Sequence, residues 1–360
     1  MEMKSMTCFS ENEISVNANG GTEIAKRTLG ALIDPELQKH FQVVSSRVRE
    51  LDETKIRIFW AHDLPEDPES EKFKDQKFKD AFHQFVFISN WQYDRYQLVH
   101  GFPYDERSIV LETGVDFSVE EKIVAVPYVK EKCDEQLTRV VYTSTPQRGL
   151  HLLVPAFESI AAKHPNAHLD VFSSFKIYGW EDRDKQFEPL YDQIRKHPQM
   201  TYHGFVPNRT LRDHLKKSHV FAYPSIWLET SCRALIEAAA MGLVCIHPNF
   251  GALADTSAGY TEMYQGDFAN QGRHAKIMAD QLDRVLCDFD RGNQSYYFDV
   301  EDERDRYMRL ARQSTYVKDR FDIDKIKVKW ENMLRGLLER YPTLESRRLK
   351  RDDVLVYRTS

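Results

Sequence analysis

The sequence predicts an α/β protein with two doubly wound domains in series, followed by C-terminal helices. Short apolar runs of strand length alternate with longer helical patterns from residue 22 to residue 248, and this alternation indicates β-α units around parallel sheets. The alternation is interrupted at 117–138, a charged stretch that contains Pro127. The length of 360 residues suits about two domains, since one domain takes roughly 100 to 200 residues.

The interruption at 117–138 is interpreted as the link between the domains. Residues 1–128 are then a short N-terminal domain, and 129–320 are the C-terminal domain. The last third of the chain is charged and helical in period. We expect 321–360 to form a C-terminal helix and tail that packs back on the N-terminal domain.

In the first domain, short apolar runs are the strand candidates and the longer patterned segments are the helix candidates. The expected strands are 41–48, 55–63, 85–90 and 108–115, and the expected helices are 22–33 and 91–102.

The second domain repeats this alternation with more units. The expected strands are 139–144, 168–174, 200–206, 220–225 and 243–248. The expected helices are 149–164, 187–197, 210–218 and a helix that carries Glu237.

Composition and charge exclude several classes of protein. A hydrophobic fraction of 41% is that of a globular chain with a real core. The net charge of −6 and the pI near 6.1 provide no basic field for nucleic acid, and nothing in the sequence supports contact with a membrane surface. The five cysteines include no C-x-x-C pair, which argues against a structural zinc site or a disulfide framework.

The scattered cysteines also favour a reducing compartment. The N-terminal segment has no apolar region typical of a signal peptide, and no stretch approaches the ~18 apolar residues of a membrane span. We therefore expect a soluble, cytoplasmic protein.

Ligands of open parallel sheets bind at the carboxyl ends of the strands, so the loops there are the candidate sites. At the start of the chain, Gly20 and Gly21 lead directly into a helix, with Thr22 as its expected N-cap. Backbone N–H groups at such a start can bind a phosphate, although a Gly-Gly turn before a helix is also common without a ligand. No G-x-G-x-x-G or Walker motif occurs, which disfavours dinucleotide and P-loop binding.

A second loop, TSTPQRGL at 143–150, opens the first helix of the second domain. Arg148 precedes Gly149 at this helix start, where a guanidinium opposes the helix dipole unless an anion lies between them. The alternative is an ordinary surface arginine. Ser144 lies in the same loop, and we expect it to be one of the ligand-binding residues.

The third loop lies in SIWLETSCRALIEAAAMG, residues 225–242. Glu229 follows a strand, and Thr230 or Ser231 is expected to cap the next helix. Glu237 falls in the second turn of that helix, within an apolar run where an unpaired carboxylate is costly.

The alternative for Glu237 is a surface ion pair with Arg233, worth only ~0.3 kcal/mol. Two carboxylates placed like Glu229 and Glu237 can instead hold vicinal hydroxyls, one set on a ribose and one on a hexose. Phosphate donors at two helix starts and carboxylates at a third loop are the profile of a nucleotide-sugar site.

Residues 223–255 resemble the signature of glycosyltransferase family 4, the large retaining group with the GT-B fold. That signature is a Glu, seven residues, a second Glu, a small-residue run, a Gly and a GALPE-like loop. Further segments also resemble the family: NGGTE (19–23), FISNWQYDRY (87–96), ETGVD (112–116), RGL (148–150) and YHGFVPNRTLRDHLKKSHVFAYPS (202–225).

The resemblance implies two Rossmann-like domains facing across a cleft, and it implies roles for single residues. Glu237 would bind the ribose hydroxyls, Glu229 the transferred sugar, and Arg148 the diphosphate with help from Gly21. The remaining implied contacts are the amides of Ser231 and Cys232 at the sugar or phosphate, Gly204 and Phe205 at the base, and His62 near the reaction centre.

The implied activity is transfer of a hexose from a nucleoside-diphosphate sugar, most simply a UDP- or GDP-sugar, to a glycan, glycolipid or other hydroxyl acceptor with retention of configuration. His62, Arg148 and Glu229 form the expected catalytic set. No cofactor and no metal ion are expected. The D-x-D triplets at 182–184 and 288–290 follow a loop and a helix, unlike the metal-binding triplets that follow a strand in the other main glycosyltransferase fold.

Some residues depart from the family pattern. Tyr142 stands where an additional arginine is often found, Cys232 replaces a usual Gly, and Arg233 replaces an apolar residue. A protein of this fold that binds a nucleotide sugar or glycan without transfer is therefore the alternative function. An epimerase or a phosphorylase on the same fold is a third. A phosphorylase needs a cofactor-lysine motif that this sequence lacks, and an epimerase would release free UDP with no acceptor added.

Overall fold

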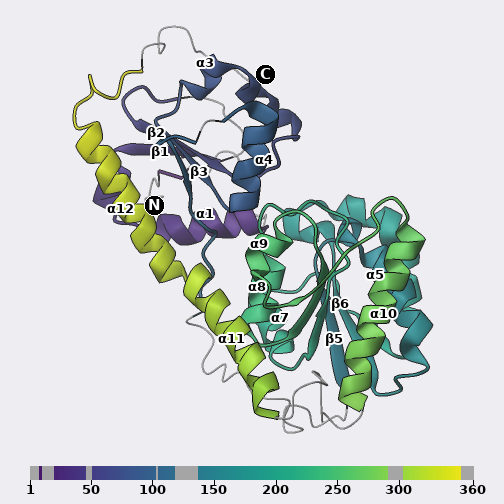
Figure 1. Ribbon diagram of the computed structural model, residues 1–360. Helices are drawn as coiled ribbons and strands as arrows, with labels where there is room; N and C mark the ends of the chain where they lie inside the picture. The colour runs from purple at the N-terminus through teal and green to yellow at the C-terminus, as the bar shows by residue number, and fades with distance from the viewer. Residues whose placement is uncertain are drawn as a thin grey trace, which may run out of the picture. The chain divides into compact units, whose positions relative to one another are not determined.

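The computed structural model describes residues 8–9, 20–45, 51–102, 104–117, 137–290 and 303–349. It divides into two compact units, one comprising Met1–Phe117 with Arg320–Ser360 and the other Ser118–Asp319 (Figure 1). Each unit contains a parallel sheet with helices on both faces, so the predicted α/β class is confirmed. The domain boundary predicted at residue 128, and most of the predicted link, lie outside the described residues.

Among the described residues of the first unit, four parallel strands are ordered β1-β2-β3-β4. They are β1 (Phe41–Val44), β2 (Ile56–Ala61), β3 (Gln84–Phe87) and β4 (Ser108–Val110). Every residue of β2 and β3 is buried, as expected for a parallel sheet that is covered on both faces.

One face of this sheet is covered by α1 (Gly21–Leu32), α2 (Pro35–Gln38) and α12 (Ile323–Arg340). Trp60 of β2 meets Trp330 of α12 with ring centroids 4.9 Å apart, and Phe9 lies 5.7 Å from each of them. The C-terminal helix therefore completes the core of the unit in which the chain begins.

The other face is covered by the 3-10 helix η1 (Pro68–Lys74), α3 (Gln76–Lys79) and α4 (Asn90–His100). Its core is almost wholly aromatic, with Phe59, Phe73 and Phe85 at its centre. Helix α4 begins where the side chain of Ser89 accepts a bond from the amide of Gln92.

The chain returns to the first unit through a short backbone pairing. Val115 donates to the carbonyl of Phe321 at 2.8 Å, and Ile323 donates back to Val115 at 3.1 Å. A side chain at Gly114 would have its Cβ 3.1 Å from the Cα of Ile323, so glycine permits this approach. The side chain of Asp322 caps α12, so this helix starts separately from the helix that ends at Phe321.

Trp330 provides a test of this arrangement. We expect Trp330→Ala to lower the free energy of unfolding of the first unit by about 3–5 kcal/mol, because it removes a fully buried indole and leaves a cavity. Val328 lies on the same helix and is 54% exposed, so Val328→Ala is the control, with an expected change within about 0.5 kcal/mol. Urea unfolding of the full chain measures both, and equal stabilities of the two variants would contradict this packing.

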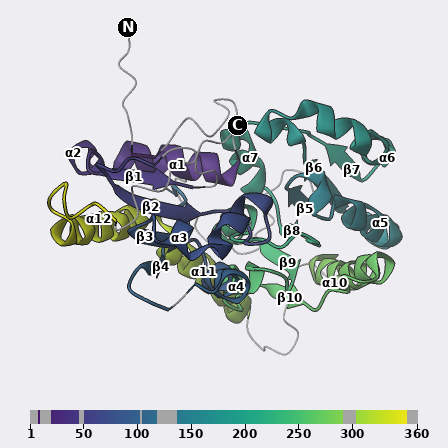
Figure 2. The ribbon, with the colours of Figure 1, turned by 90° about the horizontal axis from the view of Figure 1, so that it is seen from above.

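In the described part of the second unit, six parallel strands are ordered β10-β9-β8-β5-β6-β7. Their bounds are β5 (Thr138–Thr143), β6 (Ala167–Phe172), β7 (Met200–Tyr202), β8 (Val220–Ala222), β9 (Val244–Pro248) and β10 (Glu262–Tyr264). The chain starts in the middle at β5 and runs outward to β7. It then returns beside β5 as β8 and runs outward the other way, an order that can be followed in Figure 2.

On one face of this sheet, α5 (Leu150–Ala161) and α10 (Gln271–Asp290) lie side by side in both views (Figures 1 and 2). The other helices of the unit are α6 (Glu188–Lys196), α7 (Asn208–Leu215), α8 (Arg233–Ala240), α9 (Leu253–Ser257) and α11 (Glu303–Phe321).

Helix α11 holds the end of α8. Its Gln313 side chain donates to the carbonyls of Ala239 and Leu243, and Ser314 donates to Ala240 at 2.6 Å. The bond to Ala240 satisfies a carbonyl group at the end of α8, and the bond to Leu243 holds the residue before β9.

The predicted strands are all present, but several end earlier than predicted. The strand predicted at 200–206 ends at Tyr202, and the one predicted at 220–225 ends at Ala222. The residues that follow leave the sheet and form loops, and these loops carry the candidate site. Strand β10 and helices α2, α3 and α9 are too short to give a clear periodic signal and were not predicted.

Candidate functional site

The chain adds strands to the second sheet outward in one direction from β5 and in the opposite direction from β8, so the strand order reverses between these two neighbouring strands. In open α/β sheets, ligands bind at such a switch point, outside the carboxyl ends of the two strands. The loop after β5 carries Arg148 and the loop after β8 carries Glu229. The structure brings these two predicted residues into direct contact.

Arg148 and Glu229 form a buried ion pair. Nη1 of Arg148 lies 2.5 Å from Oε1 of Glu229, and the side chains are 22% and 5% exposed. Burial alone would lower the pKa of Arg148, but the neighbouring carboxylate outweighs it and holds that pKa well above its usual value. The guanidinium also lies over the ring of Trp227, 5.7 Å from its centroid.

Tyr223 completes this cluster, and its role was not predicted from the sequence. Its hydroxyl donates to the same Oε1 of Glu229 at 2.5 Å. Burial and the adjacent carboxylate raise the pKa of Tyr223 well above its usual value, so the phenol stays protonated and keeps donating. Glu229 is therefore oriented by two donors from two different loops.

Two glycines let the three loops approach one another. Gly149 has φ +119°, and a Cβ there would lie 2.9 Å from the carbonyl carbon of Pro224. Gly251, after β9, has φ +59°, and a Cβ there would lie 2.7 Å from the backbone nitrogen of Glu229. The amide of Ala252 donates to the carbonyl of Glu229 at 2.7 Å. The loop that follows the neighbouring strand β9 therefore holds the backbone of Glu229 in place.

Unpaired polar atoms gather at this edge of the sheet. Thr145 Oγ1, Gln147 Oε1 and Arg148 Nε follow β5, and Ser173 Oγ follows β6; all four are buried and have no hydrogen-bond partner within the described residues. Buried polar atoms normally have one. Their concentration in adjacent loops indicates a place where a polar ligand binds.

Glu237 lies in the second turn of α8, as predicted, and is 6% exposed. Its Oε1 is 2.9 Å from Nε of Arg233 and 3.6 Å from Nη2 of Arg212 on α7. The i,i+4 pair with Arg233 is therefore present, but it is buried. Arg212 was not predicted, because it is 25 positions from Glu237 and only the packing of α7 against α8 brings it there.

The predicted helix caps are wrong at both candidate helix starts. Helix α8 begins at Arg233 with Cys232 as N-cap, not Thr230 or Ser231, because Cys232 is the last residue with extended backbone (φ −108°, ψ 91°). Helix α1 begins at Gly21 with Gly20 as N-cap, not Thr22. Gly20 has no side chain to cap α1, and Cys232 makes no side-chain cap hydrogen bond at α8.

Other predicted donor-binding residues of the second unit lie along the same sheet edge or close to it. Ser144 is half-buried and bonds the side chain of Tyr142, whose hydroxyl also donates to Thr145. Gly204 and Phe205 follow β7 and are half-buried.

Ser231 and Cys232 precede α8. Ser231 is half-buried, whereas the Cys232 thiol is buried and its pKa is raised by burial. The thiol is therefore not a reactive nucleophile, and any contact of this residue with a ligand would use its backbone.

His62, Gly20 and Gly21 belong to the first unit. His62 follows β2, and its ring centroid lies 4.3 Å from that of Trp60. Burial, and then the charge of Lys26, lower the pKa of His62 to about 3, so its imidazole is neutral at physiological pH. A Cβ placed on Gly21 would meet no atom of the described residues within 4 Å, which leaves the start of α1 accessible.

Comparisons with known proteins match one segment of the chain to a family model and most of the chain to solved structures. Residues 130–290 match the family model described as glycosyl transferases group 1, a segment that contains Arg148, Glu229 and Glu237. No curated protein matches the chain. Across the described residues, no helix is both long and apolar enough to cross a membrane.

Solved structures are similar over most of the chain. A glycosyltransferase from Rickettsia africae ESF-5 is 17% identical, with a TM-score of 0.62 over 94% of this chain and 85% of that one. Anabaena HepE in complex with UDP and glucose is 14% identical, with a TM-score of 0.56 over 89% and 77%. Sucrose-phosphate synthase from Thermosynechococcus elongatus is 14% identical, with a TM-score of 0.58 over 88% and 72%. The chain therefore has the fold of these proteins, and the predicted GT-B class is confirmed.

Gly251 tests the site geometry. We expect Gly251→Ala to displace Glu229 and to reduce any function of the site, because its Cβ would collide with the backbone of Glu229. Gly259 is the matched control: it has φ +80° but nothing within 4 Å of a Cβ. Both variants carry the backbone cost of about 1 kcal/mol for a positive φ, so a thermal scan separates that shared cost from the collision. Equal melting midpoints for the two variants would show that the approach of Gly251 is not tight.

Proposed function

We propose that this protein is a retaining glycosyltransferase that moves a hexose from a nucleoside-diphosphate sugar to a hydroxyl acceptor. The observation that carries the proposal is the buried pair of Arg148 and Glu229 at the switch point of the second sheet. It lies within the segment that matches the glycosyl transferases group 1 model.

The donor diphosphate is assigned to Arg148. A guanidinium has five N–H donors, and the bond to Glu229 uses a donor on Nη1. Nε is buried and has no partner among the described residues, so donors remain for phosphate oxygens. A fixed cation in a poorly solvated site stabilises the negative charge that develops when the diphosphate leaves.

The transferred hexose is assigned to Glu229. Arg148 and Tyr223 both bond its Oε1, so Oε2 receives no bond from either of them. An oriented carboxylate oxygen of this kind accepts hydrogen bonds from sugar hydroxyls. The family resemblance assigns the backbone amides of Ser231 and Cys232 to the sugar or phosphate beside it.

The ribose is assigned to Glu237. Both arginine contacts fall on its Oε1, and Oε2 can accept from a pair of vicinal hydroxyls. The solved structures of Anabaena HepE contain UDP, which supports a UDP-sugar as the first donor to test, with GDP-sugars next. Gly204 and Phe205 are assigned to the base by the family resemblance.

In the proposed reaction the bond from the anomeric carbon to the diphosphate oxygen breaks, and a bond to the acceptor oxygen forms on the same face. The departing phosphate takes the acceptor's proton, so no separate base is needed. Neither a cofactor nor a metal ion takes part. The resemblance assigns His62 to the reaction centre and Gly21 to the diphosphate, and a neutral His62 suits a hydrogen-bonding role there.

The alternative is a protein that binds nucleotide sugar or glycan without transfer. Tyr142, which stands where a second cation is often found, favours it: the side chain is buried and bonds the carbonyl of Thr145. Turnover separates the two functions, because a binding protein raises its melting midpoint with donor but forms no product.

The proposal is tested by a thermal-shift screen of UDP-, GDP-, ADP- and TDP-sugars, since only a ligand that binds the folded state raises the midpoint. The stabilising donor is then assayed for transfer. We expect Glu229→Ala and Arg148→Ala each to reduce kcat by ~10² to 10³ while remaining folded. Glu181→Ala, at an exposed residue of the same unit, is the control. Wild-type turnover in either site variant would refute the assignment.

Glu237 is expected to act on binding more than on the chemical step. Glu237→Ala and Glu237→Gln should raise the KM for the donor and leave kcat within a few-fold, because ribose contacts are made equally before and during transfer. The glutamine variant keeps the side-chain volume between Arg212 and Arg233. An unchanged KM together with a large loss of kcat would place Glu237 at the reacting sugar instead.

A further inference from the structure

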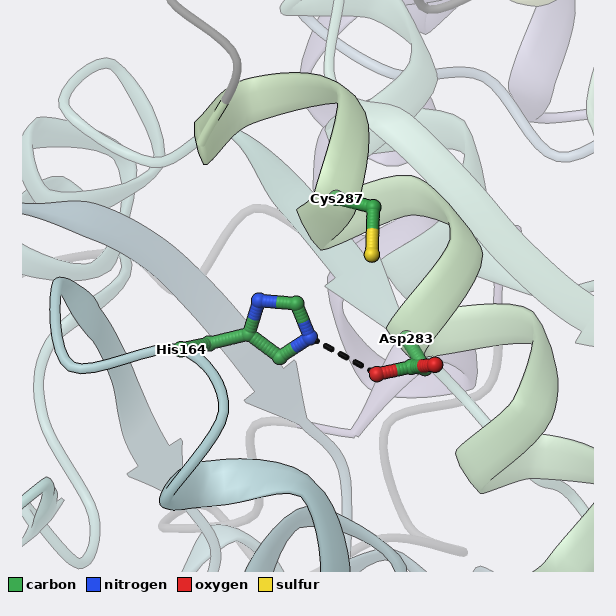
Figure 3. Close-up of side chains that lie close together, drawn as sticks. All are labelled: His164, Asp283 and Cys287. Carbon is green, nitrogen blue, oxygen red and sulfur yellow. Dashed lines mark hydrogen bonds and ion pairs between the residues drawn. The ribbon is translucent and has the colours of Figure 1, made fainter.

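His164, Asp283 and Cys287 form a cluster in the second unit that has no part in the proposed transfer. Their side chains converge from two elements (Figure 3), and one potential ligand atom of each lies within 4.8 Å of the other two. His164 follows α5, whereas Asp283 and Cys287 lie on α10. A histidine nitrogen, a carboxylate oxygen and a thiol sulfur are all zinc ligands.

The backbone holds His164 in place before any ion binds. Its amide donates to Ala161 at 3.1 Å, and its carbonyl accepts from Ala167 at 2.9 Å and from the Gln199 side chain at 2.8 Å. The imidazole is 2% exposed. His164 is therefore already ordered, and it would lose little conformational entropy when an ion binds.

Asp283 and Cys287 are four residues apart on α10, so they face the same side one helical turn apart. The Asp283 side chain is 29% exposed and Cys287 is partly exposed, which gives an ion access from solvent. Nε2 of His164 lies 2.8 Å from Oδ1 of Asp283. Two ligands of a tetrahedral zinc ion are roughly 3.3 Å apart, so a small rotation of the carboxylate admits the ion.

Lys163 fits the same arrangement. Its Nζ lies 3.6 Å from Oδ2 of Asp283, and its side chain is 65% exposed. An ion bound to Oδ1 leaves Oδ2 to this lysine, and such outer contacts orient a ligating carboxylate. The lysine can also move away, since it is largely in solvent.

We propose that His164, Asp283 and Cys287 bind a zinc ion, with water as the fourth ligand. The mixed nitrogen, oxygen and sulfur set suits Zn²⁺ and disfavours Mg²⁺ and Ca²⁺, which prefer oxygen ligands alone. On binding, Cys287 releases its thiol proton to solvent and forms the sulfur–zinc bond. His164 binds as the neutral ring through Nε2, with its proton on Nδ1.

The ion would be structural and would take no part in transfer. Arg148 precedes α5 and His164 follows it, and a helix of 12 residues is about 18 Å long. The zinc would join α10 to the turn between α5 and β6. It is therefore compatible with a transfer reaction that uses no metal.

The test is a titration of the metal-free full-length chain, prepared without tag histidines, with Zn²⁺ and separately with Co²⁺. We expect one saturable ion per chain, a zinc-dependent rise in melting midpoint, and a thiolate-to-cobalt absorption band. Cys287→Ser, Asp283→Asn and His164→Asn should each weaken binding by at least about 100-fold, more than the loss of an outer contact. The cobalt band should disappear in Cys287→Ser.

Asp280→Asn is the matched control, an exposed carboxylate one turn earlier on the same helix, and it should bind as the wild type does. If His164→Asn does not fold, the two α10 variants decide the question, because their side chains are partly exposed. The proposal would be overturned if the wild type showed no saturable binding, or if Cys287→Ser and Asp283→Asn bound zinc as tightly as the wild type does. Transfer activity does not enter this test, so it is independent of the proposed function.

Discussion

The ion pair between Arg148 and Glu229 is the constraint on which the candidate site depends. Both side chains are largely removed from water, and an unpaired charge in such a position costs several kcal/mol. The pair therefore requires the loops after β5 and β8 to meet, and Gly149 lets them do so by approaching the carbonyl of Pro224. Tyr223 and the loop at Gly251 then hold Glu229 from two further directions. Backbone contacts thus position the side chains of Arg148 and Glu229, so both are already oriented before a ligand binds.

Helix α5 connects the two sites proposed for the second unit. Its N-terminal end follows Arg148, and its C-terminal end precedes the turn that holds His164. The candidate site lies in loops at the carboxyl edge of the sheet. Among the described residues, four buried polar atoms without a hydrogen-bond partner lie in the loops after β5 and β6. The proposed zinc site instead lies between α10 and the turn after α5, and these two helices already pack together on one face of the sheet. Separation along one helix would let an ion stabilise the fold without adding charge beside Arg148 and Glu229.

Much of the fold and part of the site could be predicted from local sequence. The alternation of apolar runs located the longer strands and helices because burial on both faces requires a nearly continuous apolar strand. Glu237 and Arg148 could be selected because each is a charged residue in a place that disfavours an unpaired charge, and Glu229 because it follows a strand at the carboxyl edge of the sheet. Among their other partners, only Arg233 was recognised from the sequence, by its i,i+4 spacing from Glu237. Tyr223, Arg212 and Trp227 belong to the same environment only through packing, and the helix caps were misplaced because Cys232 and Gly20, not the nearby hydroxyl residues, are the last non-helical positions.

The sequence by itself determined the α/β class, the identity of the three charged residues and the expectation that no cysteine pair binds zinc. These conclusions rest on composition, periodicity and short spacings, which act between neighbours in the chain. Only the tertiary structure decided that Arg148 and Glu229 bond each other, that Glu237 is held by Arg212 as well as Arg233, and that a single cysteine lies beside His164 and Asp283. Apart from the Arg233–Glu237 pair, which lies within α8, these contacts join separate elements of the fold. Strand order and helix packing bring them together, and neither is encoded in the spacing of the residues.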